Sequence, residues 1–425
     1  MDPLAHTLLG AALAKTRLGR STPLAMPTLV LAANVPDVDV AAYFWSSDAA
    51  LAFRRGLTHG PLGLALLPAL VAIVVWLAGR RWGRYAASSR SAATAAVGHA
   101  EHDDPSRAAP DPGDWAHRRP AHPGPAHRAA AHPEPAHPAA ARRHTAAAGA
   151  APVELAPLLA LSYLGALTHP ALDWLNTYGV RFLHPFDTRW FYGDALFIVD
   201  PWMWLVLGGA LFLAHRTSRR SLVLYASLAV VATVLVVGAA DSTAGKALWV
   251  AGLLAVVSAR ATGRPRTERA RQAVATAAVA AFALYVVALL FAAGLARGIV
   301  RDSISAPVDD LLVGPLPVTP LRREVVVSTP DEIRYGRFGW ISEPRLTWSG
   351  WSRPRPTSTP VVDAALADPT VQGFLGWARF LFVEIDEYPD FFEVHLMDAR
   401  YTLERNARFG SAVVRVPKLE HPSLR

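Results

Sequence analysis

The sequence predicts a mainly α-helical, polytopic membrane domain of about 6–8 spans, followed by a small C-terminal α+β domain. Of the 425 residues, 52% are hydrophobic and the mean hydropathy is +0.23, which is too apolar for an ordinary soluble chain of this length. The apolar residues gather in runs about as long as a helix needs to cross hydrocarbon. From about residue 300 on, short alternating runs typical of strands replace them.

Five apolar runs have the length of membrane-spanning helices. They are residues 60–78, 152–169, 196–214, 221–240 and 272–296. Three shorter runs, at 4–14, 23–35 and 247–259, leave it open whether they span the membrane fully. The first run has no basic region before it, so we do not expect a cleaved signal peptide.

The formal net charge of +8 comes from Lys and Arg in short loops between the apolar runs. Such clusters mark the cytoplasmic side of a membrane protein, so we expect no nucleic-acid partner. Placing these clusters inside gives a multi-pass membrane protein whose C-terminal domain is extracytoplasmic. The chain has no cysteine, so any metal must be held by nitrogen and oxygen atoms.

The chain divides into four segments: N-terminal membrane segments with half of the candidate site (1–85), a linker (86–150), the rest of the membrane domain (151–299) and a soluble α+β domain (300–425). The linker is rich in Ala, Pro and His and cannot bury a core, so we expect it to be disordered and cytoplasmic. A weak metal-collecting role of its histidines is the alternative.

Several patterns in the C-terminal segment predict individual elements. The runs "REVVVSTP", "IRYGRFGWI", "RFLFVEID", "DFFEVHLMD" and "SAVVRV" are typical of strands. The third and fourth are expected to form a hairpin around Tyr388 and Pro389. "VVDAALADPTVQGFLGWA" is expected to form a helix on its face.

Ionisable residues in or beside apolar segments indicate function, because such positions are costly for charge. Six of them fall at the outer ends of their segments in the threading drawn from Lys and Arg. They are His6, Asp37, Asp39, His59, His169 and Asp173. Histidine and aspartate are ligands of Zn²⁺ and Mn²⁺, so the set predicts a site for one to three divalent ions, with zinc preferred and Mn or Mg as alternatives.

Local spacing supports this metal site. His169 and Asp173 are four residues apart and share one helix face, although Pro170 is expected to kink or restart that helix. Asp37 and Asp39 are two apart and can present both carboxylates to one side of an extended or turn segment. Taken singly, each of these residues is also compatible with a cap, a turn or an interfacial position.

Other residues are candidates for chemistry next to the metal. Asp39 is the predicted general base if it is not a full ligand. Arg55, with Arg54, is predicted to bind an anionic group such as phosphate, and contact with lipid headgroups is an equally good interpretation. Four residues of the following loop are further candidates, for which a solvated or aromatic-belt role is the alternative. They are His184, Asp187, Asp194 and Asp200.

The motifs "PDVD", "RRGLTHGPLG" and "THPALDWLNTYGVRFLHPF" resemble those of the YdjM-type membrane-bound metal-dependent hydrolase family, over roughly residues 1–215. Gly60 stands where the family usually has serine, Asn176 precedes Thr177, and Val40 stands where a histidine is common. The family is in turn similar to the zinc-dependent phospholipase C and P1 nuclease group. The resemblance implies a helical metalloenzyme of the bacterial plasma (inner) membrane that hydrolyses phosphodiesters.

The sequence thus predicts a membrane-embedded hydrolase of phosphoester or ester bonds that uses a metal-activated water at the outer membrane face. A substrate at the bilayer is expected to be amphiphilic, such as a phospholipid or a lipid-linked phosphate. The alternatives are a non-catalytic metal-binding membrane protein, such as an ion carrier, and a scaffold. Purely apolar inner halves of the spans argue against a carrier, and the missing His-Glu-x-x-His motif argues against a metalloprotease.

Overall fold

The computed structural model describes residues 1–100, 153–215, 218–239, 242–263, 265, 267–405, 407 and 409–418, and of residues 82–100 it describes only the helical backbone. It contains two compact units. The first comprises Met1–Trp76 and Glu154–Arg425, and the second comprises Leu77–Val153. Everything that concerns the candidate site lies in the first unit.

Five of the described helices are long and apolar enough to cross a membrane, which confirms a mainly helical membrane domain. They are α4 (Pro61–Ala100), α5 (Leu155–Trp174), α8 (Arg219–Ala239), α9 (Thr243–Thr262) and α10 (Glu268–Asp302). The number of such helices is below the expected 6–8. The short run 247–259 lies inside α9, which has the length of a full span.

Two boundaries differ from the prediction. The run 196–214 does not form one long helix, because its helical part begins only at Pro201. It consists of α6 (Pro201–Met203), a π-helical turn (Trp204–Gly208) and α7 (Gly209–Ala214). Helix α4 continues to Ala100 and so includes the first residues of the predicted linker, whereas residues 101–150 of that linker lie outside the described residues.

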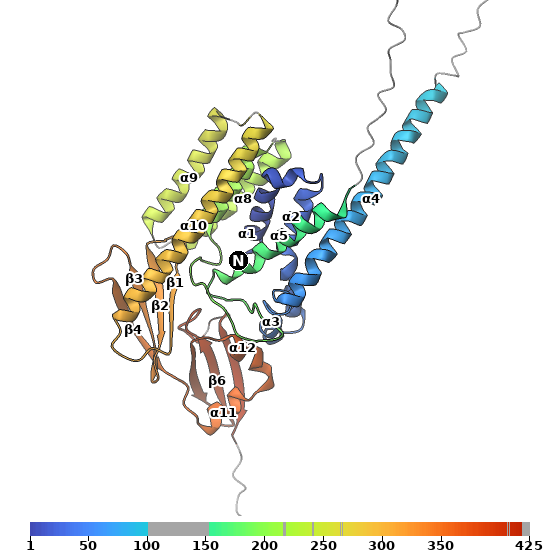
Figure 1. Ribbon diagram of the computed structural model, residues 1–425. Helices are drawn as coiled ribbons and strands as arrows, with labels where there is room; N and C mark the ends of the chain where they lie inside the picture. Colours follow the sequence, from blue (N-terminus) through green and yellow to red (C-terminus); the bar gives the residue numbers. More distant parts are fainter. Residues whose placement is uncertain are drawn as a thin grey trace, which may run out of the picture. The chain divides into compact units, whose positions relative to one another are not determined.

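The N-terminal helices α1 (Pro3–Lys15) and α2 (Ala25–Asn34) have 13 and 10 residues, too few for a span of about 20. Helix α2 packs against both α1 and α5 (Figure 1). Glycines permit this close approach: a Cβ atom would lie 2.8 Å from the Leu29 carbonyl oxygen at Gly10 of α1 and 3.0 Å from it at Gly165 of α5. His6 and His169 lie one turn from these glycines, so the contact brings them close.

Short helices connect α2 to α4. A 3₁₀ helix, η2 (Val35–Phe44), carries Asp37 and Asp39, and α3 (Ser47–Phe53) follows it. Ser46 caps α3 by accepting a hydrogen bond from the amide of Ala49. The turn between Arg54 and Gly60 then contains His59 and leads into α4.

The C-terminal segment forms two antiparallel sheets. The first has the strand order β1 (Asp310–Pro315), β2 (Arg322–Ser328), β3 (Glu332–Gly339), β4 (Leu346–Pro354), and the second has the order β5 (Leu381–Glu387), β6 (Phe391–Asp398), β7 (Ser411–Pro417). The five predicted strands correspond to β2, β3, β5, β6 and β7. The hairpin at Tyr388 is also confirmed. The predicted helix is divided into α11 (Pro360–Leu366), a 3₁₀ turn (Pro369–Val371) and α12 (Gln372–Trp377).

Helix α10 joins the membrane domain to these sheets. Its 35 residues extend about 52 Å, well beyond the ~30 Å of a hydrocarbon layer. Ala296 and Val300 near its end pack on one face of the first sheet, beside Val313 and Val325. The other face of that sheet packs against the second sheet. This contact involves Leu312, Val326, Ile333, Phe380, Phe382, Met397 and Ala399.

We predict that Gly10→Ala destabilises the protein even though alanine favours a helix by about 1 kcal/mol. The added methyl group meets the Leu29 carbonyl at 2.8 Å, and overpacking of this kind costs about 1–3 kcal/mol. The matched control is Gly298→Ala in α10, where an added Cβ meets nothing within 4 Å. The thermal unfolding midpoint in detergent should fall for Gly10→Ala only. Equal midpoints for the two variants would show that α1 and α2 are not in close contact.

Candidate metal centre

Four of the predicted ligands converge on one point. Asp37 comes from η2, His59 from the turn before α4, and His169 and Asp173 from the last turns of α5. One ligand atom of each lies within 4.8 Å of the others. His59, His169 and Asp173 are fully buried, and the Asp37 side chain is 15% exposed.

The spacing of these atoms suits a tetrahedral ion. With metal–ligand bonds of about 2.0–2.1 Å, two ligand atoms are separated by about 3.3 Å. In the structure, Asp173 Oδ2 lies 3.2 Å from His59 Nε2 and 3.5 Å from His169 Nε2, and Asp37 Oδ1 lies 3.6 Å from His169 Nε2. The donor set of two imidazoles and two carboxylates is typical of Zn²⁺ or Mn²⁺.

Three of these atoms make no hydrogen bond. They are His59 Nε2, His169 Nε2 and Asp173 Oδ2, which are buried and have no hydrogen-bond partner among the described residues, although Asp173 Oδ2 also pairs with the Arg55 guanidinium. Buried polar atoms are normally satisfied, and several convergent exceptions indicate a missing ion or water. The residues present therefore fit a divalent cation.

Neighbouring groups orient both histidines. His169 Nδ1 lies 2.6 Å from the Ala33 carbonyl oxygen, which can only accept, so Nδ1 carries the proton and Nε2 presents its lone pair to the centre. Thr58 Oγ1 donates to Asp39 Oδ2 at 2.9 Å and lies 2.9 Å from His59 Nδ1, which can donate to it. Such second contacts are typical of metal-ligating histidines.

Asp39 lies beside the four ligands rather than among them. Its Oδ2 accepts hydrogen bonds from the Arg55 amide and from Thr58, and its Oδ1 accepts one from Arg54. Burial alone would raise the pKa of Asp39, but hydrogen bonding and charge from His59, together with the Arg54 guanidinium, outweigh it and hold that pKa below its ordinary value. Both oxygens are thus engaged, which suits a group that orients His59.

The structure places Asp37 at the edge of the centre. Arg54, whose side chain is 19% exposed, donates to Asp37 Oδ1 at 3.0 Å. These two side chains are the part of the cluster that solvent or a substrate reaches.

His6 adjoins the group from α1. Its ring stacks on that of His169 with centroids 3.7 Å apart, and its Nε2 lies 3.5 Å from Asp173 Oδ1. Neither ring nitrogen of His6 has a hydrogen-bond partner among the described residues. The amino group of Met1 contacts the same Asp173 oxygen. His6 therefore faces the opposite oxygen of Asp173 from the other two histidines.

Arg55 is buried and its guanidinium is engaged within the protein. Its Nε lies 3.0 Å from Asp173 Oδ2, and one terminal nitrogen donates to Asn176 Oδ1 and to the Gly179 carbonyl, each at 3.0 Å. The guanidinium also lies over the Tyr178 ring, 4.4 Å from its centroid. Arg55 thus links Asp173 to the segment 176–179. The partly exposed Arg54 is the better placed of the two arginines for an external anion.

Sequence reasoning did not assign the polar partners Thr58, Asn176 and Tyr178. Asn176 and Tyr178 lie in the quoted motif "NTYG", and Thr58 directly precedes His59 in "LTHG". Their presence in these motifs was the available signal. What they bind depends on contacts between distant segments, such as Asn176 with Arg55.

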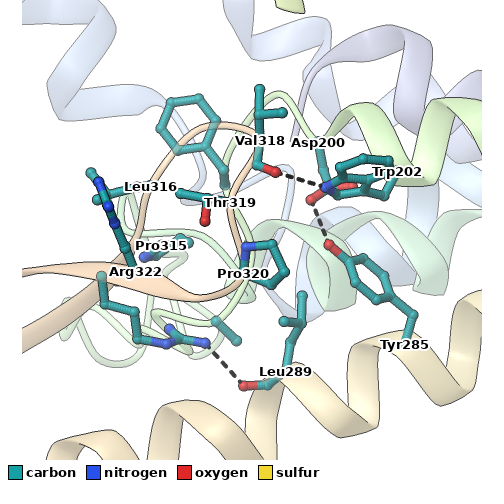
Figure 2. A pocket seen from close by; sticks show the side chains of 13 residues that line it. Asp200, Trp202, Tyr285, Leu289, Pro315, Leu316, Val318, Thr319, Pro320 and Arg322 are labelled. Carbon is teal, nitrogen blue, oxygen red and sulfur yellow. Dashed lines mark hydrogen bonds between the residues drawn. The ribbon is translucent and has the colours of Figure 1, made fainter. Parts of the chain in front are cut away.

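The three candidate aspartates of the loop before α6 bind groups outside the metal centre. Asp187 pairs with Arg189, and Asp194 accepts hydrogen bonds from Arg297 and Arg379. Asp200 caps α6 through the Met203 amide and accepts a hydrogen bond from the Tyr285 hydroxyl group. Figure 2 shows Asp200 at a pocket of about 20 Å³ between α10 and the β1–β2 connection, which has room for about one water. None of these aspartates belongs to the group of four ligands within the described residues.

The C-terminal domain holds the segment beside Arg55. Arg400 donates to the Thr177 carbonyl at 2.9 Å, and Trp377 Nε1 donates to the Tyr178 carbonyl at 3.3 Å. Arg400 is itself fixed by a buried ion pair with Asp398 at 2.7 Å. On the other side, α12 packs on α3. The domain thus supports both segments that flank the centre.

The fold and the cluster define a multi-pass helical membrane protein with a possible metal-binding group. Residues 1–245 match the family described as YdjM inner membrane protein. The match covers more than half of the chain, so the chain belongs to this family, as the motifs predicted. No curated protein and no solved structure matches the chain. The comparisons give no link to the phospholipase C and P1 nuclease group.

We predict that Arg400→Met costs about 3–5 kcal/mol of stability, because it leaves the Asp398 carboxylate buried without its ion-pair partner. The control is Arg405→Met. This side chain is 43% exposed in its ion pairs, and removing such a pair costs under about 1 kcal/mol. Thermal unfolding of the two purified variants measures the difference. A loss for Arg400→Met no greater than for the control would contradict the assigned role of the buried pair.

Proposed function

We propose that the protein is a membrane-bound, metal-dependent hydrolase whose single divalent ion is held by Asp37, His59, His169 and Asp173. The observation that carries this proposal is the convergence with Asp37 of three buried ligand atoms that make no hydrogen bond among the described residues, at the spacing of a tetrahedral site. Zinc is the proposed ion, and manganese is the alternative that the same donors permit.

The ion would supply Lewis acidity, lowering the pKa of a bound water toward neutrality and polarising a phosphoryl or ester oxygen. The residues at the edge supply the rest. Arg54 can bind a phosphate oxygen beside Asp37 through charge-assisted hydrogen bonds. Asp39 orients His59 and is no longer our candidate for general base. His6 is buried beside Asp173 Oδ1, and both its nitrogens are free of hydrogen-bond partners among the described residues.

The proposed substrate is an amphiphile with a phosphoester or ester near its headgroup. The candidate centre lies at the ends of apolar segments, where a lipid headgroup can reach it while the acyl chains stay in the bilayer. The Lys and Arg clusters between the spans support an orientation with this centre and the C-terminal domain at the outer face.

A non-catalytic metal-binding protein is the second candidate, since the same four ligands also fit an ion without catalysis. Catalysis requires a coordination position that substrate or water can take. The partial exposure of Asp37 and Arg54, at 15% and 19%, favours the enzyme.

We predict that the purified full-length protein contains zinc or manganese in stoichiometric amount and that His59→Ala and Asp173→Ala each lose it. Each variant removes one ligand, and the two ligands come from segments that are remote in sequence. Metal content is measured by mass spectrometry. His215→Ala and Asp187→Ala are the matched controls, since neither residue touches the cluster. The linker histidines contribute equally to all five proteins.

Equal metal in the wild type and both ligand variants would exclude the proposed centre. If metal is lost as predicted, the release of headgroup from vesicles of phosphatidylethanolamine and phosphatidylglycerol separates the two candidates. Stoichiometric metal without hydrolysis of these or of other phosphodiester and ester lipids would favour the non-catalytic protein.

We predict that Asp39→Asn weakens metal binding without abolishing it. This variant keeps the four ligands but loses a carboxylate that orients His59 through Thr58, which typically weakens metal binding about 10–100-fold. Competition with a chelator measures the affinity. Asp173→Asn should lose binding altogether. Complete loss in Asp39→Asn as well would show that Asp39 is a ligand, as the sequence alone had suggested.

A further inference from the structure

Large apolar side chains on η2 and α3 are turned outward next to the candidate centre. Phe44 and Trp45 are 90% and 79% exposed, and they adjoin further exposed residues on the same two contacting helices. The exposed apolar set, here called the 38–57 segment, comprises Val38, Val40, Tyr43, Phe44, Trp45, Phe53 and Leu57. Apolar exposure of this extent normally marks an interaction site or a membrane contact.

The aspartates and the apolar residues of η2 point in different directions. Asp37 and Asp39 turn toward the histidines, whereas Val38 and Val40, which alternate with them along the chain, are 55% and 52% exposed. The 3₁₀ helix therefore has one face that belongs to the centre and one face that belongs to the surroundings. Any surface that covers the face with Val38 and Val40 therefore lies next to the proposed ligand Asp37.

The position of the segment identifies its surroundings. Helix α4, which has the length and hydropathy of a membrane span, begins at Pro61, only four residues after Leu57. Its first turns expose Leu62 and Leu66. An apolar segment that leads directly into a span lies close to the membrane boundary, where Trp, Tyr and Phe are enriched. A bilayer around α4 would therefore continue onto η2 and α3.

The charges of the segment fit lipid headgroups. Between Tyr43 and Gly60 the charged residues are Asp48, Arg54 and Arg55. Asp48 accepts a hydrogen bond from the Phe374 amide, and Arg55 is buried against Asp173. Arg54, which pairs with Asp37 and Asp39, is the partly exposed cation, and its guanidinium lies 5.9 Å from the centre of the Tyr43 ring. An arginine beside interfacial aromatic residues attracts the phosphate of a lipid.

We propose that the 38–57 segment lies in the headgroup layer of the bilayer as an in-plane element and holds the phosphate of a membrane phospholipid at Arg54. The location in the bilayer depends on the exposed side chains and on their position next to α4, and not on the metal. The presentation of that phosphate to Asp37 and the metal rests on the proposed function. A phospholipid, rather than a soluble phosphate, would then reach the centre from the side of the membrane.

The test of location uses the natural absence of cysteine, because one introduced cysteine gives one labelled position. Phe44→Cys and Ile341→Cys, each in the full-length chain, are spin-labelled and reconstituted in nanodiscs of phosphatidylethanolamine and phosphatidylglycerol. Ile341 is the control because it is 80% exposed in the connection between β3 and β4. The label at Phe44 should collide preferentially with oxygen. The label at Ile341 should collide with a water-soluble nickel chelate several-fold more often than the label at Phe44 does.

Two results would overturn the location. A label at Phe44 as accessible to the nickel chelate as the label at Ile341 would place the segment in water. A label shielded from both oxygen and nickel would show a protein contact instead. The measurement needs no metal, so repeating it with His59→Ala separates it from the proposed function: an unchanged depth in a metal-free protein leaves the membrane location intact.

The test of Arg54 uses lipid retention. After partial delipidation, native mass spectrometry of the wild type should show phosphatidylglycerol bound that Arg54→Gln has lost, while the control Arg405→Gln retains it. Excess inorganic phosphate should not displace the lipid. Equal retention in Arg54→Gln and the wild type would remove Arg54 as the phosphate-binding group, and displacement by inorganic phosphate would show that a soluble phosphate suffices.

Discussion

The arrangement of the first unit depends on the burial of Asp173. This carboxylate lies at the end of an apolar helix with no exposed surface, and taking an ionised carboxylate out of water costs several kcal/mol unless cationic and hydrogen-bonding groups offset it. Arg55, His59 and His169 surround Oδ2, whereas His6 and the Met1 amino group face Oδ1. These groups come from α1, from the turn before α4 and from α5, so one buried charge ties three distant segments together.

The close packing of α1, α2 and α5 makes these contacts possible. Gly10 and Gly165 let the backbones approach at Leu29, and the same helix α2 supplies the Ala33 carbonyl that holds His169. Ala33 lies in the last turn of α2, where helix carbonyls lack intrahelical partners. Pro36, three residues on, has no N–H with which to bond this carbonyl. The proline of the "PDVD" motif thus helps to leave the acceptor free for the histidine.

The sequence predicted the parts of the site that depend on local periodicity. The four-residue spacing of His169 and Asp173 does place both on one face of α5, although Pro170 lies inside that helix without ending it. The two-residue spacing of Asp37 and Asp39 predicted an extended or turn segment, and η2 is a 3₁₀ helix. Both carboxylates still face the histidines and share the partner Arg54. Local patterns identified five strands, but the pairing of remote segments follows from packing that periodicity does not encode.

The contacts of the C-terminal domain show why the site needs more than the family region. The family match ends at residue 245, yet Arg400 and Trp377 hold the backbone of Thr177 and Tyr178. Two residues on, the Gly179 carbonyl accepts a hydrogen bond from Arg55, which in turn balances Asp173. A displacement of the domain would therefore reach the carboxylate through one short chain of polar contacts. Helix α12 also packs on α3, which directly precedes Arg54. The same domain therefore helps to position both the buried Arg55 and the partly exposed Arg54.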